Sequence, residues 1–195
     1  MITKTLLCIG AYCLGSISTA VLVCRWMGLP DPRSQGSQNP GATNVLRTGH
    51  KGAAAITLIG DVLKGLMPVF IAMHVYKTPL IVGLVMLSVF LGHLYPIFFQ
   101  FRGGKGVATA AGAFLALDLV LGFVLIGIWL LMMGLFRMAA LSAVVVALIA
   151  PCYVWHRLGF PFAIPVAMIS VLIIWRHRSN MQRLWQGTEP TVGRS

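Results

Sequence analysis

A glycine-rich segment with two cations, Phe101 to Thr109, is the part of the sequence best suited to chemistry. Its letters are FRGGKGVAT, and it stands between two apolar runs. Glycines let backbone N–H groups approach a ligand closely, and a helix that starts after them directs its unpaired N–H groups and positive dipole end at the same point. Lys105 adds a compact positive charge. Gly103 and Gly104 are therefore candidates for binding a phosphate group at a membrane surface, and Lys105 is a candidate catalytic residue that holds the same group.

A second group of hydrogen-bond donors lies in the loop over residues 31–47. The loop is rich in small polar residues, glycine and arginine, which is also typical of a solvated connection made of turns. Arginine has a forked guanidinium that suits phosphate, and backbone N–H groups near glycine can form an anion-binding nest. We predict catalytic roles for Ser37 and Arg47. The candidate substrate-binding residues of this loop are Gly36, Asn39, Thr43 and Asn44.

Two charged residues and a histidine are expected within the apolar runs. Asp61 and Lys64 are three residues apart and share one face of a helix, about 12 Å from the start of their run. Intramembrane charges are costly and usually functional, although a neutral pair that holds helices together fits the pattern equally well. His93 is the residue type that most readily carries a proton near neutral pH. Asp61 and His93 are candidate catalytic groups, and Lys64 is a candidate substrate ligand.

The fourth polar segment, RHRSN at residues 176–180, follows the last apolar run. Arg and His at such a place are also typical of the charges that mark the cytoplasmic end of a membrane helix. His177 and Asn180 are three residues apart, so they can face one ligand together. We predict that both bind substrate.

Composition assigns the chain to the membrane. Of its 195 residues, 58% are hydrophobic and only 10% are charged, whereas soluble proteins have about 25% charged residues. Fifteen Lys and Arg stand against four acids, which gives a formal charge of +11. Both the positive-inside bias and the attraction of anionic substrates or lipid headgroups explain this excess. The four cysteines lack the spacing of a zinc site, and we expect no metal and no cofactor.

Seven apolar runs predict an all-α integral membrane protein with about seven transmembrane helices. Most runs have the length of about 20 residues that spans a membrane. The runs are Ile2–Val23, Ala53–Val75, Leu80–Phe99, Val107–Leu117, Leu119–Phe136, Ala139–Trp155 and Phe160–Trp175. The run 107–117 covers only about 16 Å at 1.5 Å per residue, so it is either a tilted short helix or a half-span.

Charge decides the orientation and the number of crossings. With seven crossings and the N-terminus outside (periplasmic), most Lys and Arg face the cytoplasm, as the positive-inside rule requires. These residues are Arg25, Arg33, Arg47, Lys51, Arg102, Lys105, Arg137, Arg176, Arg178, Arg183 and Arg194. With six crossings the last four would lie outside. We therefore expect a cytoplasmic C-terminus, a site that faces the cytoplasm, and a short polar tail over residues 186–195.

Motifs of several other enzyme classes are missing. The sequence has no G-x-x-x-x-G-K-[ST] nucleotide loop and no G-x-S-x-G nucleophile elbow. No nucleophile stands beside an evident base, as a covalent mechanism would need. These absences disfavour a nucleotide-dependent enzyme and an acyl-enzyme intermediate.

Taken in order, the polar segments resemble one known family. GSQNPGATNVLR, GDVLKG, GHLYPIFFQFRGGKGVAT and RHRSN-x-x-RL-x-x-G-x-E are similar to the motifs of the bacterial acyl-phosphate:glycerol-3-phosphate acyltransferase family over essentially the whole chain. One departure is Gln38, where the family usually has glycine. The resemblance implies a single membrane-embedded acyltransferase domain over residues 1–195. Its cytoplasmic motif loops are about 25–52, 100–107 and 176–189.

The resemblance also implies a reaction in the bacterial inner (cytoplasmic) membrane. An acyl chain moves from acyl phosphate to the 1-hydroxyl of sn-glycerol 3-phosphate, giving lysophosphatidic acid and phosphate, the first step of phospholipid biosynthesis. The expected partners are these two substrates and membrane lipids, with no nucleic acid and no obligate protein partner. Phosphate is a good leaving group, so we expect direct attack. Asp61, His93 or a substrate phosphate oxygen is then the proton acceptor.

Two other classes of protein fit part of the pattern. A phosphate-ester transporter would also place cations in broken helices, but transporters usually have repeated halves with a site at the midplane. A non-catalytic protein that binds anionic lipids would not need four separate segments rich in hydrogen-bond donors. The gathering of polar motifs at one face favours the enzyme.

Overall fold

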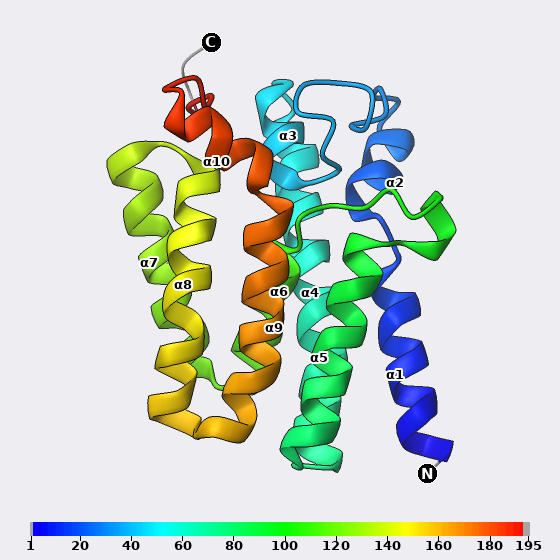
Figure 1. The fold of residues 1–195 in the computed structure, drawn as a ribbon. Coiled ribbons are helices and arrows are strands. Elements are labelled where there is room, and N and C mark those ends of the chain that lie inside the picture. Colours follow the sequence, from blue (N-terminus) through cyan, green and yellow to red (C-terminus); the bar gives the residue numbers. More distant parts are fainter. Residues whose placement is uncertain (1, 193–195) are drawn as a thin grey trace.

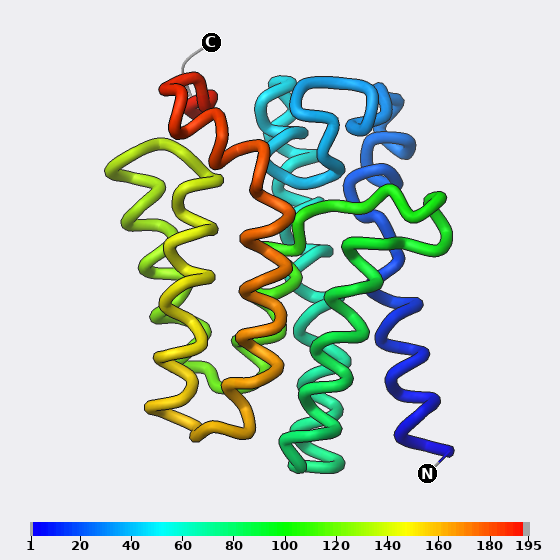
Figure 2. Tube along the Cα trace, in the orientation of Figure 1, coloured from blue at the N-terminus to red at the C-terminus, as the bar shows by residue number. Residues whose placement is uncertain are grey.

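The computed structural model describes residues 2–192, and its long helices run along roughly one common direction (Figure 1). The elements, in chain order, are α1 (Ile2–Gly15), α2 (Thr19–Trp26), α3 (Ala42–Arg47), α4 (Lys51–Val75), α5 (Pro79–Leu94), the 3-10 helix η1 (Ile97–Phe99), α6 (Val107–Leu117), α7 (Leu119–Phe136), α8 (Ala139–Leu158), α9 (Phe160–Arg176) and α10 (Arg178–Trp185). We call the end of the bundle that holds α3 and α10 the motif end. α1 begins at the opposite end, as the tube in Figure 2 also shows.

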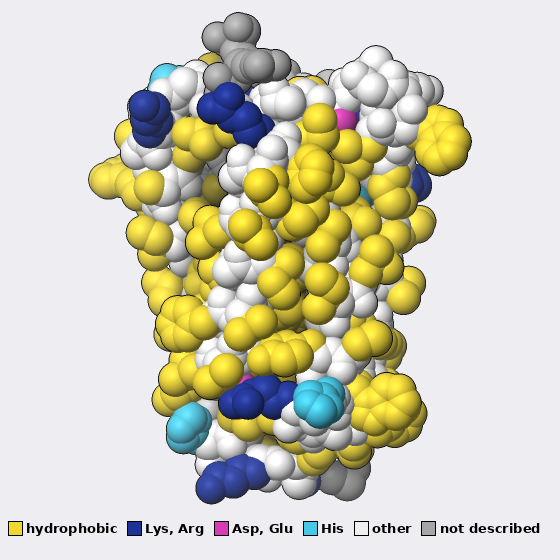
Figure 3. All heavy atoms as spheres, turned by 90° about the vertical axis from the view of Figure 1, so that its left-hand side faces the viewer, with side chains coloured by type: hydrophobic (Ala, Val, Ile, Leu, Met, Phe, Trp, Pro, Cys, Tyr) yellow, Lys and Arg dark blue, Asp and Glu magenta, His cyan; other side chains and the backbone are white. Residues whose placement is uncertain are grey.

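The lengths and apolar surface of the helices are those of an integral membrane protein, as predicted. Within residues 2–192, four helices are long and apolar enough to cross a membrane: α4, α5 with η1, α7 and α8. Two bent pairs, α1 with α2 and α9 with α10, raise the number to six. Figure 3 shows hydrophobic side chains over the middle of the molecule and Lys and Arg near its two ends.

The short predicted run is helix α6, which has 11 residues. The loop before it folds back beside the last turn of α5, where the N–H of Gly104 donates to the carbonyl of His93 at 3.2 Å. α6 therefore starts inside the bundle and needs fewer residues to reach the end where α7 begins. α6 is not one of the six candidate spans, and the predicted number of seven crossings counts it in addition to them. The positions of α1 and α10 at opposite ends of the bundle agree with an odd number (Figure 1).

The first predicted span is broken rather than continuous. α1 ends at Gly15, α2 starts at Thr19, and the two helices are bent by 44°. Nζ of Lys64 donates to the carbonyl of Ile17 in the break at 2.8 Å. Irregular backbone at membrane depth is tolerated where protein groups satisfy it, so Lys64 stabilises the break.

α4 and α6 approach each other closely through glycine. A Cβ at Gly65 would lie 2.0 Å from the carbonyl oxygen of Thr109, and a Cβ at Gly112 would lie 2.0 Å from that of Val62. Small residues allow such close helix contacts in membrane proteins. The crossing fixes α6 against α4, and with it the segment Arg102 to Gly106 that precedes α6, which we call the glycine loop.

We expect Gly112→Ala to lower the stability of the folded protein. The added methyl group forces α4 and α6 apart, and over-packing typically costs about 1–3 kcal/mol. Thermal unfolding in detergent measures the effect. Gly127→Ala on α7 is the matched control, because nothing lies within 4 Å of its Cβ position. Equal stability of the two variants would contradict the close crossing.

Candidate active site

A cavity of about 610 Å³ lies among α4, α6, α7 and α8 and reaches the motif end. Its polar lining comes from the loop before α3 and α3 itself, from α4 and α5, from the loop before α6, and from the chain after α9. The predicted site residues that line it are Ser37, Asn39, Thr43, Asn44, Arg47, Asp61, His93, Lys105, His177 and Asn180. Gly36, Lys64, Gly103 and Gly104 are not among the residues that line it. The tertiary structure therefore brings residues from all four polar segments around one cavity.

Lys105 is held at the cavity by a chain of polar contacts. Its Nζ donates a hydrogen bond to Oδ1 of Asn180. Nδ2 of Asn180 donates to Oε1 of Glu189 at 2.7 Å, and Nε of Arg183 donates to Oε2 of the same carboxylate at 2.9 Å. The carboxylate is buried, with a side chain only 1% exposed. The segment after α9 thus fixes the position of the Lys105 ammonium group.

Sequence reasoning missed the role of the C-terminal segment. Residues 186–192 do not form a free tail: Glu189 is buried. The carbonyl of Pro190 accepts a hydrogen bond from Nη2 of Arg47 at 3.1 Å, and the N–H of Val192 donates to the carbonyl of Arg137 at 2.8 Å. The prediction of a polar tail is therefore wrong for these residues, and Arg194 lies outside the described residues. The G-x-E that ends the fourth motif is the sequence signal for this contact.

Burial lowers the pKa of Lys105 to about 8. This value also includes the Glu189 carboxylate, which raises the pKa, and the guanidinium groups of Arg183, Arg176 and Arg47, which lower it. A buried cation among other cations is stabilised by an incoming anion. The surroundings of Lys105 therefore favour a dianionic ligand such as a phosphate ester.

The glycine loop packs tightly on the end of α5. A Cβ at Gly103 would lie 2.1 Å from the carbonyl oxygen of His93 and 2.5 Å from that of Leu94. A Cβ at Gly104 would lie 2.3 Å from Nε2 of His93. Gly106 is the N-cap of α6 and has a φ of 83°, which favours glycine. The loop therefore brings the N-terminus of α6, with its unpaired N–H groups, to the cavity.

Asn44 organises the first loop from within. Its Oδ1 accepts the N–H of Ser37 at 2.9 Å, and its Nδ2 donates to the carbonyls of Pro32 at 2.8 Å and Gln35 at 3.0 Å. A Cβ at Gly36 would lie 2.4 Å from the same Oδ1. The amide of Asn44 is thus used inside the loop, where it places Ser37 beside the cavity.

Gln38 has a φ of 57°, in the left-handed region. A residue with a Cβ costs about 1–2 kcal/mol in this conformation. The turn is retained because its neighbours are held by the hydrogen bonds of Asn44. The turn therefore keeps a backbone conformation that favours glycine, although residue 38 is glutamine.

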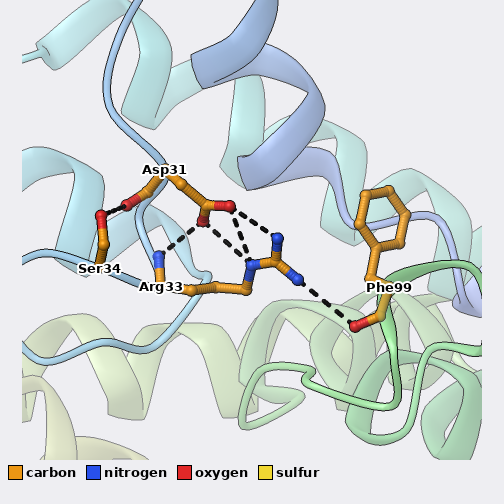
Figure 4. Close-up of polar contacts among 4 residues, drawn as sticks. All are labelled: Asp31, Arg33, Ser34 and Phe99. Carbon is orange, nitrogen blue, oxygen red and sulfur yellow. Dashed lines mark hydrogen bonds and ion pairs between the residues drawn. The ribbon is translucent and has the colours of Figure 1, made fainter.

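Arg33 ties the first loop to the segment before the glycine loop (Figure 4). Its Nε and Nη2 donate to both carboxylate oxygens of Asp31 at 2.7–3.1 Å, and its Nη1 donates to the carbonyl of Phe99 at 3.4 Å. This guanidinium lowers the pKa of Asp31. The contact links two segments that are 66 residues apart in sequence.

Asp61 and Lys64 form a buried ion pair, with 2.7 Å between Oδ1 and Nζ. Oγ1 of Thr19 donates to the same Oδ1 at 3.0 Å. Nδ1 of His93 lies 3.7 Å from this oxygen and 3.1 Å from Oγ1 of Thr109. The cluster joins α4 to the break in the first span and to the end of α5, so it holds helices together at the edge of the cavity.

Arg47 and His177 line the cavity, and each has a side-chain nitrogen that can bind a ligand. Nε of Arg47 is buried without a hydrogen-bond partner among residues 2–192. Nδ1 of His177 lies 2.8 Å from the carbonyl of Ile173, and because a carbonyl only accepts, Nδ1 carries the hydrogen of the neutral ring. Its Nε2 is then an acceptor for a hydroxyl group.

Curated relatives are similar to this chain over nearly its whole length. The profile of the glycerol-3-phosphate acyltransferase family matches residues 5–187. The chain is 50% identical over 194 residues to a glycerol-3-phosphate acyltransferase of Thioalkalivibrio sulfidiphilus, covering 99% of this chain and 96% of the relative. It is 55% identical over 182 residues to the glycerol-3-phosphate acyltransferase of Cronobacter sakazakii, and this match covers 93% of this chain and 88% of the relative.

Two crystal structures share the fold. One is the glycerol 3-phosphate form of PlsY (YgiH), an integral membrane glycerol 3-phosphate acyltransferase. Its TM-score with this chain is 0.92 and its sequence identity is 34%, and the match covers 98% of this chain and 96% of that chain. The other is the lysophosphatidic acid form of the same protein, with a TM-score of 0.90, a sequence identity of 33% and the same coverage. The resemblance of the polar segments is thereby confirmed, and the chain belongs to the glycerol-3-phosphate acyltransferase family.

Proposed function

We propose that this protein transfers an acyl chain from acyl phosphate to the 1-hydroxyl of sn-glycerol 3-phosphate, giving lysophosphatidic acid and phosphate. The observation that carries this proposal is the cavity, which joins cations and helix N–H groups at the motif end to an apolar part within the bundle. An acyl phosphate has the same two parts. Residues 1–195 act as a single membrane-embedded domain.

The apolar part of the cavity fits the acyl chain. It lies between α4, α6, α7 and α8, below the polar groups. Its lining includes Leu58, Val62, Phe114, Leu125, Ile126, Trp129, Leu130 and Val146. A transporter of small phosphate esters has no need of an apolar extension of this kind. This feature therefore favours an enzyme with a lipid substrate.

The phosphate groups bind where the cations and the start of α6 meet. Lys105, Arg47 and the first N–H groups of α6 hold phosphate and stabilise the oxyanion that develops on the acyl carbon. Ser37, Thr43 and Asn180 orient glycerol 3-phosphate, and Nε2 of His177 accepts from one of its hydroxyl groups. These side chains line one cavity, so both substrates bind side by side.

The proton of the attacking hydroxyl goes to a phosphate oxygen of the substrates. Oδ1 of Asp61 is already occupied by Lys64 and Thr19. Nδ1 of His93 faces Thr109, and its Nε2 edge is covered by Gly104. In this proposal Asp61 and His93 support the site, and a substrate phosphate oxygen acts as the base. The ester bond forms as the acyl–phosphate bond breaks, and the hydroxyl proton leaves with phosphate.

The distribution of charge supports a motif end in the cytoplasm. Among residues 2–192, the Lys and Arg of this end are Arg25, Arg33, Arg47, Lys51, Arg102, Lys105, Arg137, Arg176, Arg178 and Arg183. Lys4, Lys77 and Arg157 belong to the opposite end. By the positive-inside rule this distribution supports a periplasmic N-terminus in a bacterial inner membrane and an active site that faces the cytoplasm.

Purified protein with acyl phosphate and glycerol 3-phosphate tests the proposal. We expect phosphate release and lysophosphatidic acid formation that require both substrates and no CoA thioester. Uptake of glycerol 3-phosphate into sealed vesicles without product would instead indicate a transporter. Binding of anionic lipid with neither reaction would indicate a non-catalytic protein.

The pKa of Lys105 predicts a loss of substrate affinity at alkaline pH. The ammonium group is charged below a pKa of about 8 and neutral above it, while phosphate esters are already dianionic because their second pKa is about 6. We expect the KM for glycerol 3-phosphate to rise by up to about tenfold per pH unit above pH 8. Lys105→Arg is the matched control, because its guanidinium stays charged and removes this dependence. The same alkaline rise in both proteins would refute the assignment.

A further inference from the structure

Arg176, at the end of α9, donates hydrogen bonds to the backbone of the glycine loop. Its Nη2 donates to the carbonyl of Gly103 at 2.9 Å and to that of Gly104 at 3.0 Å, and its Nε donates to the latter at 3.2 Å. The guanidinium carbon lies 6.0 Å from the ring centre of Tyr95, in a cation–π contact. Arg176 itself is not part of the described cavity lining.

Because peptide groups are planar, the hydrogen bonds from Arg176 to these carbonyls also fix the direction of the N–H groups that follow them. In a trans peptide the C=O and the following N–H point in opposite directions, and the described chain has no cis bonds. The Gly103 carbonyl faces Arg176, and the N–H of Gly104 faces the carbonyl of His93. The Gly104 carbonyl also faces Arg176, so the N–H of Lys105 points away from it. Lys105 and the residues after it line the cavity.

We propose that Arg176 is a positioning residue, which holds the Gly103–Lys105 backbone so that the Lys105 N–H and the start of α6 face the bound phosphate. This inference rests on the proposed function, because it takes the cavity to be the phosphate site. A rigid loop binds phosphate without first being ordered, and such preorganisation contributes directly to affinity. A forked guanidinium is suited to this task because it reaches two adjacent carbonyl oxygens at once.

Arg178 separates this role from a general effect of positive charge at the helix end. It lies two residues further on and is exposed. Its guanidinium carbon lies 4.7 Å from the ring centre of Trp175, and its Nη1 donates to the carbonyl of Trp175 at 3.4 Å. Arg176 and Arg178 thus have equal charge at nearly the same place, but of the two, Arg176 holds the loop.

The experiment compares Arg176→Ala, Arg176→Lys and Arg178→Ala in purified enzyme of verified thermal stability. Steady-state kinetics give kcat and the KM for glycerol 3-phosphate, and inorganic phosphate serves as a competitive probe. We expect Arg176→Ala to raise the KM and the phosphate inhibition constant by about 10- to 100-fold, the effect of losing charged hydrogen bonds. Most of kcat should remain. Arg176→Lys should restore part of the affinity, and Arg178→Ala should match the wild type.

Three outcomes would overturn the inference: unchanged phosphate affinity in Arg176→Ala, equal losses in Arg176→Ala and Arg178→Ala, or wild-type affinity in Arg176→Lys. If Arg176→Ala does not fold, the comparison of Arg176→Lys with the wild type decides alone. Failure of the proposed function looks different, because the wild-type enzyme would then release no phosphate with both substrates present.

Discussion

Lys105→Ala is expected to lose at least about 100-fold in kcat/KM, while the protein still inserts and folds. Removal of one preorganised donor from an oxyanion site typically costs about 10²–10³ in rate. Lys105 also supplies affinity, because its ammonium group is buried among three arginines and is fixed by Asn180. The initial rate of phosphate release at several substrate concentrations measures the loss.

Lys4→Ala is the control for Lys105→Ala. Lys4 is exposed at the opposite end of the bundle, where its ammonium nitrogen lies 5.8 Å from the ring centre of Tyr76. The variant removes the same charge from the same residue type and should keep wild-type activity. Normal turnover by Lys105→Ala would remove lysine from the phosphate site.

Gly103→Ala is expected to lose a comparable share of activity through substrate binding. Its Cβ would lie 2.1 Å from one backbone carbonyl oxygen and 2.5 Å from another. Neither atom belongs to a flexible side chain, so the loop must leave the end of α5 and the grip of Arg176. We expect the KM for glycerol 3-phosphate to rise at least about tenfold, since a displaced loop is no longer preorganised.

Gly134→Ala on α7 controls for the added methyl group, because nothing lies within 4 Å of its Cβ position. The two large effects are distinguishable by pH. Gly103→Ala keeps the ammonium group of Lys105, so its KM should still rise above pH 8, whereas Lys105→Ala should lose this dependence. Wild-type KM in Gly103→Ala would show that the loop does not need its contact with α5.

The sequence by itself determined the membrane class, the helix positions and the family. Hydropathy and helical rise are local properties, so the apolar runs coincide with helices of the structure, although the first run is broken into α1 and α2. The polar motifs are also local strings, and their order was enough to indicate the family that the comparisons confirm. Charge was enough to predict that the ends of the chain lie on opposite sides.

Only the tertiary structure decided what each polar residue contacts. Asn44 was predicted to bind substrate; it lines the cavity, and its amide also holds the first loop together. Nε2 of His93 lies against Gly104, and Glu189, expected in a short polar tail, is buried and accepts a hydrogen bond from Asn180. Arg176 had the pattern of a charge at a helix end, yet it donates to two carbonyls more than 70 residues away in sequence. A hydrogen bond forms where folding brings its donor and acceptor together, and a local sequence pattern contains no information about partners that distant.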